Sequence, residues 1–255
     1  MKVSARQAAQ YVLMLSLAFA AGCPVTQSQD VPAPALKCVE PITGEKYWLY
    51  VPSNYSRDRD WPLVVTLHGT NPWDGYTRQI KEWKALAEDK GLIVVAPRLL
   101  SSQGILPVSR GRWYEDLQRD ERVILAAMDD VSSRYRIDRQ AVLLTGFSAG
   151  GYALHYVGLR NPERFSMLIA RSCNSDVRML EDQVKLTDAA RRLPIMLFWG
   201  KEDPVMTDQG WAIFEYLRLH RCFETRKGEI RGGHLRRPEL AYRYWLAHLP
   251  SRHRT

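Results

Sequence analysis

The sequence predicts one α/β domain with a mostly parallel central β-sheet and helices on both faces, in three layers. Three observations predict it. Short apolar stretches alternate along the chain with longer stretches of helical periodicity. Several of the apolar stretches are continuous, which is typical of strands buried on both faces. About 230 residues remain once the amino-terminal segment is set aside, and single α/β domains commonly reach that length.

Residues 1–22 have the pattern of a signal peptide. Lys2 and Arg6 precede an apolar run of about ten residues, which is too short to span a membrane. The run ends in Ala-Ala-Gly before Cys23, and this ending resembles a bacterial lipobox, in which the peptide is cut before the cysteine and the thiol is acylated. We therefore expect export to the bacterial cell envelope, with a membrane as partner through a lipid on Cys23.

An ordinary cleaved signal peptide, which would release a secreted protein, and a mitochondrial or structural segment are the alternatives for the amino terminus. Residues 23–37 are rich in Pro, Gln and Ser, and we expect them to form a tether. The folded domain is then expected to occupy residues 38–255.

Charge and cysteine content indicate neither a nucleic-acid partner nor a metal. The formal net charge of +8 is concentrated from residue 218 onward, and no nucleic-acid motif accompanies it. Besides Cys23 there are Cys38, Cys173 and Cys222, none of them at metal-ligand spacing. Their pairing is left open.

The first half of the chain shows strands and a helix in clear order. Residues 46–51 alternate aromatic and polar side chains, as a half-buried strand does, whereas residues 62–67 form a continuous apolar run. Apolar residues recur at helical spacing over 76–90, and Gly91 follows as a carboxyl-terminal cap. A second buried strand is expected over 92–96.

The second half continues the alternation. The longest helix is expected over 115–136, with acidic residues in its first turn. The other expected strands are 141–145, 166–170, 194–199 and 223–230, and the other expected helices run from Gly146 to about 160, over 207–220 and over 237–249. Ligands of such sheets bind beyond the carboxyl ends of the strands, so candidate functional residues belong in the strand-to-helix loops.

The strongest functional signal is the segment Gly-Phe-Ser-Ala-Gly-Gly at 146–151. It has the form G-x-S-x-G between a buried strand and a helix, which is the context of a nucleophile elbow. Small residues are needed there because Ser148 must sit in a sharp, strained turn with its hydroxyl exposed. Ser148 is therefore the candidate nucleophile.

A serine hydroxyl needs a base within hydrogen-bonding reach. Of the six histidines, His234 follows the last strand within Gly-Gly-His, where the glycines allow the loop to turn the imidazole back over the sheet. Asp203 follows the strand over 194–199 and is the candidate partner of His234. Glu202, beside it, and Asp176, after the preceding strand, remain alternatives.

An acyl-transfer site also needs two fixed donors for the oxyanion. The Ala149 N–H follows the nucleophile, and the Thr70 N–H lies in the loop His68-Gly69-Thr70 after the strand over 62–67. We expect these two donors. We expect His68 to brace the loop rather than to transfer protons.

Four aromatic residues follow loops of the expected site and are candidates for substrate binding: Trp73, Tyr76, Trp113 and Tyr114. Packing within the core or on the surface is the alternative role for them. The charged segment 174–192 is expected to form a small cap over the site.

The segments LHGT, GFSAGG, WGKEDPV and GGH resemble those of the α/β-hydrolase superfamily, in the chain order Ser148, Asp203, His234. Within it, the chain resembles secreted esterases of the polyhydroxybutyrate depolymerase and feruloyl esterase group, although Thr70 stands where that group often has cysteine. The resemblance implies hydrolysis of a small or medium ester through an acyl-enzyme, without a cofactor. A serine peptidase of the same fold, and a catalytically silent lipoprotein that binds an envelope partner, are the alternative functions.

Overall fold

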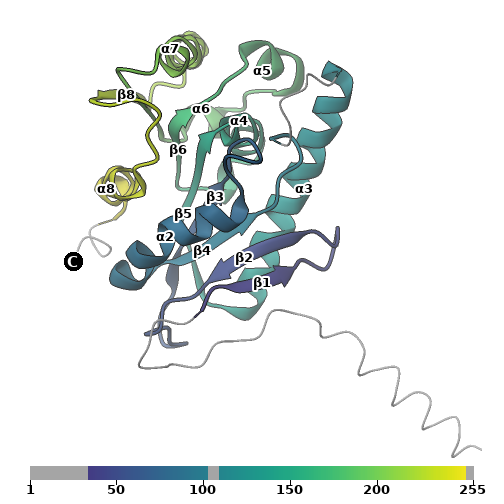
Figure 1. Cartoon of the computed structure of the whole chain (residues 1–255), viewed down its shortest axis with the longest axis vertical. Helices are drawn as coiled ribbons and strands as arrows, with labels where there is room; N and C mark the ends of the chain where they lie inside the picture. Colours follow the sequence, from purple (N-terminus) through teal and green to yellow (C-terminus); the bar gives the residue numbers. More distant parts are fainter. Residues whose placement is uncertain (1–33, 103–108, 251–255) are drawn as a thin grey trace, which may run out of the picture.

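The computed structural model describes residues 34–102 and 109–250, and within them eight strands form one sheet in the order β1-β2-β4-β3-β5-β6-β7-β8 (Figure 1). The strands from β4 to β8 in this order run parallel, and β1 and β2 join the β4 edge antiparallel. The bounds are β1 Leu36–Val39, β2 Lys46–Tyr50, β3 Trp61–Leu67, β4 Ile93–Pro97, β5 Ile137–Ser148, β6 Met167–Cys173, β7 Ile195–Gly200 and β8 Thr225–Ile230. The predicted mostly parallel sheet is confirmed.

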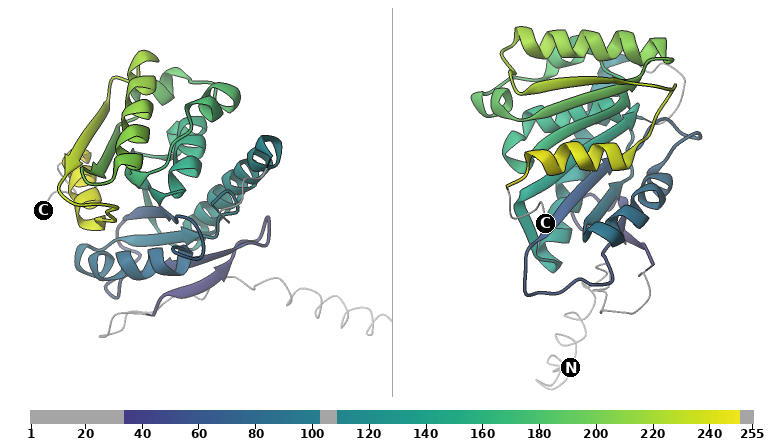
Figure 2. Two further views of the ribbon diagram at one scale, coloured as in Figure 1. Left: turned by 45° about the horizontal axis from the view of Figure 1, so that its top comes forward. Right: turned by 90° about the vertical axis from the view of Figure 1, so that its left-hand side faces the viewer.

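Helices cover both faces of the sheet and bury two separate apolar cores. Helices α2 and α8 pack on one face, where Trp83 and Trp245 are fully buried. Helices α3, α4 and α7 cover the opposite face, and the right-hand view of Figure 2 shows α8 in front of the sheet with α7 beside β8. The bounds are α2 Tyr76–Lys90, α3 Arg110–Arg134, α4 Gly150–Arg160, α5 Val177–Gln183, α6 Asp188–Arg192, α7 Pro204–Leu219 and α8 Pro238–His248. The predicted three layers are confirmed.

Some boundaries differ from those expected. Strand β1 begins at Leu36, so the sheet extends two residues into the segment interpreted as a tether. Helix α3 begins at Arg110 rather than at residue 115, because the Ser109 side chain caps it by accepting a hydrogen bond from the Arg112 N–H at 3.3 Å. The expected signal peptide and the candidate lipidation site, Cys23, lie outside the described residues.

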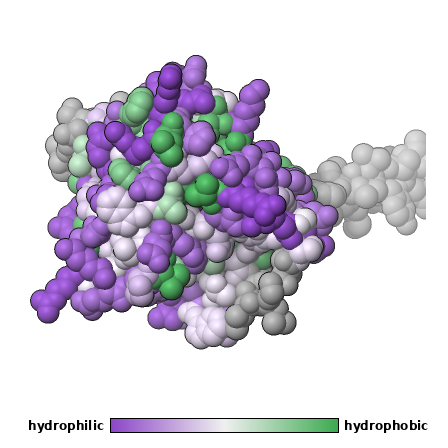
Figure 3. Space-filling model, turned by 90° about the horizontal axis from the view of Figure 1, so that it is seen from above, coloured by the Kyte–Doolittle hydropathy of each residue, from purple (hydrophilic) through white to green (hydrophobic). Residues whose placement is uncertain are grey.

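The face seen from above in Figure 3 is mostly hydrophilic, and its apolar side chains lie singly or in small groups. In the part of the chain that the structure describes, no helix has the length and apolar composition needed to cross a membrane.

Candidate active site

Ser148 is the last residue of β5, and its backbone is held in the left-handed region at φ 53°. This conformation is costly for a residue with a side chain and is found where a fold over-determines it. The turn is also tight: a Cβ on Gly150 would lie 2.6 Å from the Leu67 carbonyl oxygen, and one on Gly146 would lie 2.8 Å from the Gly150 carbonyl oxygen. The sharp turn expected from the G-x-S-x-G segment is therefore present, and α4 begins directly after it.

His234 and Asp203 meet across the loops after β8 and β7. His234 Nδ1 lies 2.7 Å from Asp203 Oδ2, and the side chains are 40% and 14% exposed. Because a carboxylate can only accept, this bond assigns the ring proton to Nδ1 and leaves Nε2 free to receive another. Asp203 also caps α7, its Oδ1 accepting from the Met206 N–H at 3.2 Å.

The other two candidate carboxylates lie elsewhere. Glu202 is exposed to solvent. Asp176 caps α5 by accepting from the Met179 N–H at 2.8 Å and pairs with Arg110 at 3.2 Å. Of the three carboxylates considered from the sequence, the structure brings Asp203 to the imidazole.

Ser148, Ala149, His234 and Thr70 line one cavity of about 570 Å³ at the carboxyl ends of the strands. The ring of Phe147, beside the serine, lies 4.7 Å from the ring of His234. These residues come from three different strand-to-helix loops, after β3, β5 and β8, and converge on one cavity, as expected for a parallel sheet.

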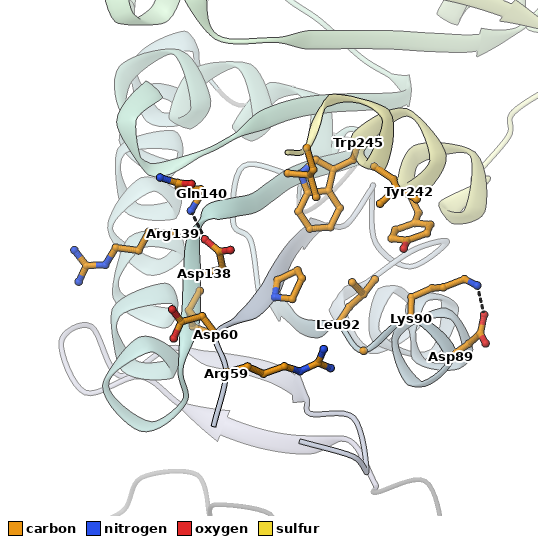
Figure 4. Close-up of a pocket in the computed structure, with 15 residues that line it drawn as sticks. Arg59, Asp60, Asp89, Lys90, Leu92, Asp138, Arg139, Gln140, Tyr242 and Trp245 are labelled. Carbon is orange, nitrogen blue, oxygen red and sulfur yellow. Dashed lines mark hydrogen bonds and ion pairs between the residues drawn. The ribbon is translucent and has the colours of Figure 1, made fainter. Parts of the chain in front are cut away.

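A larger cavity, of about 930 Å³, lies at the amino ends of β3 and β5 (Figure 4). Acidic and basic side chains line it together with apolar residues of α8, and the described residues that line it include no Ser, Cys or His. Cavity volume therefore does not identify the active site, and the smaller cavity, which is lined by Ser148 and His234, is the candidate.

The loop after β3 is held so that one N–H remains available. The Gly69 N–H donates to Asp74 Oδ2 at 2.7 Å, the Gly69 carbonyl oxygen lies 2.8 Å from His68 Nδ1, and the Thr70 carbonyl oxygen accepts from the Asp74 N–H at 2.9 Å. Among the described residues, no backbone carbonyl accepts a hydrogen bond from the Thr70 N–H.

His68 orients this loop. Its Nε2 accepts from the Leu99 N–H at 2.9 Å, which assigns the proton to Nδ1 and makes Nδ1 the donor to the Gly69 carbonyl. Burial lowers the pKa of His68, which keeps the ring neutral at pH 7. In a trans peptide the C=O and the following N–H point in opposite directions, so the Thr70 N–H points away from His68.

The four aromatic candidates do not all reach the cavity. Trp73 lines it and is 61% exposed. Trp113 lies behind Tyr152, with ring centroids 5.0 Å apart, and Tyr152 lines the cavity. Tyr76 and Tyr114 are not among the residues that line it; the Tyr114 hydroxyl donates to Asp182 at 2.7 Å. Of the segment expected to form a cap, Asn174 lines the cavity.

Several cavity residues were not indicated by the sequence. Ser101 and Ser102 follow β4, and Asp74 and Arg236 lie next to predicted residues without belonging to a motif. Tyr152 lies in the first turn of α4, and its place directly after the nucleophile segment was the one usable signal. Within the described residues there is no group of three or more His, Cys, Asp or Glu placed to hold a metal ion.

The fold, the serine at a sharp turn and the histidine that lines the same cavity and contacts a carboxylate define the class of this protein as the α/β-hydrolase fold class. The chain belongs to the family described as "Putative esterase", whose model matches residues 45–254.

The chain is also similar to several individual proteins. A bifunctional acetylxylan esterase/xylanase of Neocallimastix patriciarum is 31% identical over 108 residues, which are 42% of this chain and 15% of that protein's length. The structure of a ferulic acid esterase from Anaeromyces mucronatus superposes with a TM-score of 0.64 at 18% identity, over 88% of this chain and 92% of that one. A fluorophosphonate-binding serine hydrolase of Staphylococcus aureus gives 0.62 at 16% identity, over 86% and 98%. These two likenesses show the fold.

Proposed function

We propose that this protein is a serine esterase that hydrolyses small or medium carboxylic esters through an acyl-enzyme on Ser148. The observation that carries the proposal is the shared cavity: a serine at φ 53° faces the same space as an imidazole whose Nδ1 lies 2.7 Å from a carboxylate. A binding protein has no need of all three groups. The relatives that act on acetyl and feruloyl esters support the same chemistry.

In the proposed first step, Ser148 Oγ attacks the ester carbonyl carbon while its proton passes to His234 Nε2. The Ala149 and Thr70 N–H groups hold the negative oxygen that forms. The C–O bond to the alcohol then breaks, and the leaving oxygen takes the proton from Nε2. Asp203 stays ionised and holds the imidazole in the Nδ1–H tautomer.

In the second step a water molecule attacks the acyl carbon and gives its proton to Nε2. The bond to Oγ breaks, the carboxylic acid leaves, and Oγ regains its proton. No other reactant is consumed, and the site returns to its starting state.

The test uses the purified protein beside Ser148→Ala on p-nitrophenyl esters of increasing acyl length, methyl ferulate and a peptide anilide. We expect ester turnover in the wild type and a fall of at least about 10³-fold in the variant. Anilide turnover comparable to ester turnover would favour the peptidase alternative. Equal background rates in both proteins would overturn the proposal and favour the silent binding protein.

We also propose that the protein is exported and held at a membrane through a lipid on Cys23. The support is the sequence pattern around that residue. Expression of the full chain with a clickable fatty acid should label the wild type and leave Cys23→Ser unlabelled. A wild type that is found free of lipid outside the cell would favour an ordinary signal peptide.

A further inference from the structure

A cluster of charged side chains lies between the loop that carries Thr70 and the loop that carries His234. We call it the buried polar cluster: Asp74, Gln79, Glu82, Arg171 and Arg236. Gln79 and Arg171 are fully buried, and the side chains of Asp74, Glu82 and Arg236 are 3%, 10% and 23% exposed. Two carboxylates face two guanidinium groups, so the formal charges cancel.

Stability alone is a poor explanation for such a cluster. Taking charges out of water costs several kcal/mol for each ion, and packed apolar residues of similar volume are often as stabilising. A buried carboxylate is also one of the rarer interior groups unless it is paired. The contacts that each charge makes are therefore more informative than their number.

Asp74 holds the loop that carries Thr70. Its Oδ2 accepts from the Gly69 N–H at 2.7 Å and from Gln79 Nε2 at 2.8 Å, while its own N–H donates to the Thr70 carbonyl oxygen at 2.9 Å. The carboxylate and main chain of one residue thus fix the peptide groups on both sides of the Thr70 N–H. This leaves the direction of that N–H with little freedom.

Arg236 holds the loop that carries His234, two residues earlier. One guanidinium nitrogen lies 3.1 Å from Asp74 Oδ1 and 3.0 Å from Glu82 Oε2, and the guanidinium stacks over the Phe147 ring at 4.1 Å. The Arg236 carbonyl oxygen accepts from Arg171 at 3.2 Å. Phe147 precedes Ser148 in the sequence, and its ring also contacts the His234 ring. Arg236 is therefore linked through Phe147 to both proposed reacting residues.

We propose that Asp74 is a positioning residue of the esterase site. Its carboxylate aims the Thr70 N–H at the oxyanion, and its pairing with Arg236 fixes the spacing between that donor and His234. The proposal rests on the proposed function, because it assigns a role within that mechanism. Since an oxyanion donor acts mainly in the transition state, loss of the alignment lowers kcat far more than it raises KM.

The test compares Asp74→Ala, Asp74→Asn and Arg236→Met with the wild type and with Asp130→Ala as a matched control. Asp130 is a similarly shielded carboxylate, paired with Arg134 on α3 and bonded to Tyr47, outside the cavity. Measured for each are kcat, KM, the thermal midpoint and the affinity for an alkylboronic acid, whose tetrahedral adduct with serine resembles the intermediate.

We expect Asp74→Ala to lower kcat by roughly 10- to 100-fold, with KM changed by less than about threefold, and to lose boronic acid affinity in parallel. Asp74→Asn keeps an acceptor for Gly69 and should regain much of kcat. Arg236→Met should lower kcat by a smaller factor. In the double variant Asp74→Ala, Arg236→Met, the loss should be less than the product of the single losses, because both act through one link.

The Asp130→Ala control distinguishes a loss of loop positioning from a general loss of stability. Asp130→Ala should lower the thermal midpoint and leave kcat and boronic acid affinity unchanged. If Asp74→Ala instead behaves like Asp130→Ala, with kcat and boronic acid affinity unchanged, the proposal is overturned while the proposed function stands. If Asp74→Ala does not fold, Arg236→Met decides in the same way, because it is also expected to lower kcat. Wild-type inactivity on all esters would overturn the proposed function and this role together.

Discussion

Gly69 packs directly against Ser148. A Cβ placed on Gly69 would lie 2.9 Å from the Ser148 Cβ and 3.3 Å from the Phe147 carbonyl oxygen, both closer than ordinary van der Waals contact. The loop that supplies the Thr70 N–H is therefore in contact with the nucleophile turn itself. Neither partner can give way easily, because Ser148 is held at φ 53° and Phe147 is buried in the sheet.

Replacing Gly69 by alanine should push the Thr70 loop away from the nucleophile. We expect kcat for p-nitrophenyl acetate to fall by about 10- to 1,000-fold, the range for a lost oxyanion donor. Gly111→Ala is the matched control, because a Cβ there meets nothing within 4 Å. Retention of full activity by Gly69→Ala would show that the loop does not serve the oxyanion.

Exchanging Asp203 for asparagine should remove the charge that holds the His234 tautomer. We expect kcat to fall by about 10²- to 10⁴-fold, since an amide in that place can favour the wrong tautomer. Glu202→Gln, one residue away and exposed, should leave kcat unchanged. Steady-state kinetics on one ester would decide, and the reverse order of effects would reassign the acid.

His155 makes stability depend on pH. It is buried on α4, and this burial, partly opposed by the Gly151 carbonyl, lowers its pKa to about 4. The unfolded chain binds a proton to this ring below its ordinary pKa of about 6.5, whereas the folded chain does not. Stability is therefore fully present above that value and falls as the pH drops towards 4, by roughly 3 kcal/mol from this group.

The measurement is urea unfolding of the wild type and His155→Gln between pH 4 and pH 7.5. The variant should lose less stability than the wild type on acidification, whatever its absolute stability. Parallel curves for the two proteins would show that His155 does not contribute.

Trp73 should favour aromatic esters. Its indole is 61% exposed and lines the cavity, so it can stack on a ring that enters from solvent. Trp73→Ala should lower kcat/KM for methyl ferulate by about 3- to 10-fold, the range expected for one aromatic contact, and change that for methyl butyrate less. Phe223→Ala, which removes a 55% exposed aromatic from another part of the surface, is the control. Equal losses on both esters would argue against a stacking role.

The strands and the three principal residues could be predicted because each depends on local patterns. Continuous apolar runs identify β3, β4 and β7, and Ser148, Asp203 and His234 each follow a strand within a recognisable segment. Strand β1 was not predicted, because four residues with mixed burial carry too little pattern. Roles at the three residues stay predictions until the kinetic tests are made.

The buried polar cluster could not be predicted, for a physical reason. A charged residue in an apolar run normally marks the end of a strand, and the strand over 166–170 was expected to stop before Arg171. The structure continues β6 to Cys173, because Arg171 finds Glu82 and Gln79 across the fold. Likewise Asp74 and Arg236 are 162 residues apart, and only the folded chain shows that they pair.

Because the charges of the buried polar cluster cancel, this cluster adds no net charge beside the candidate active site, whereas the chain as a whole is positively charged. The whole chain carries a formal charge of +8, yet the two guanidinium groups of the buried polar cluster are matched by two carboxylates. Long-range fields are weakened by dissolved salt, while short, shielded pairs are weakened little. A neutral ester should therefore be hydrolysed at the same rate in dilute buffer and in strong brine. With an anionic substrate, any loss of rate at high salt would come from screening of the positive charges on the protein surface, which attract such a substrate before it reaches the cavity.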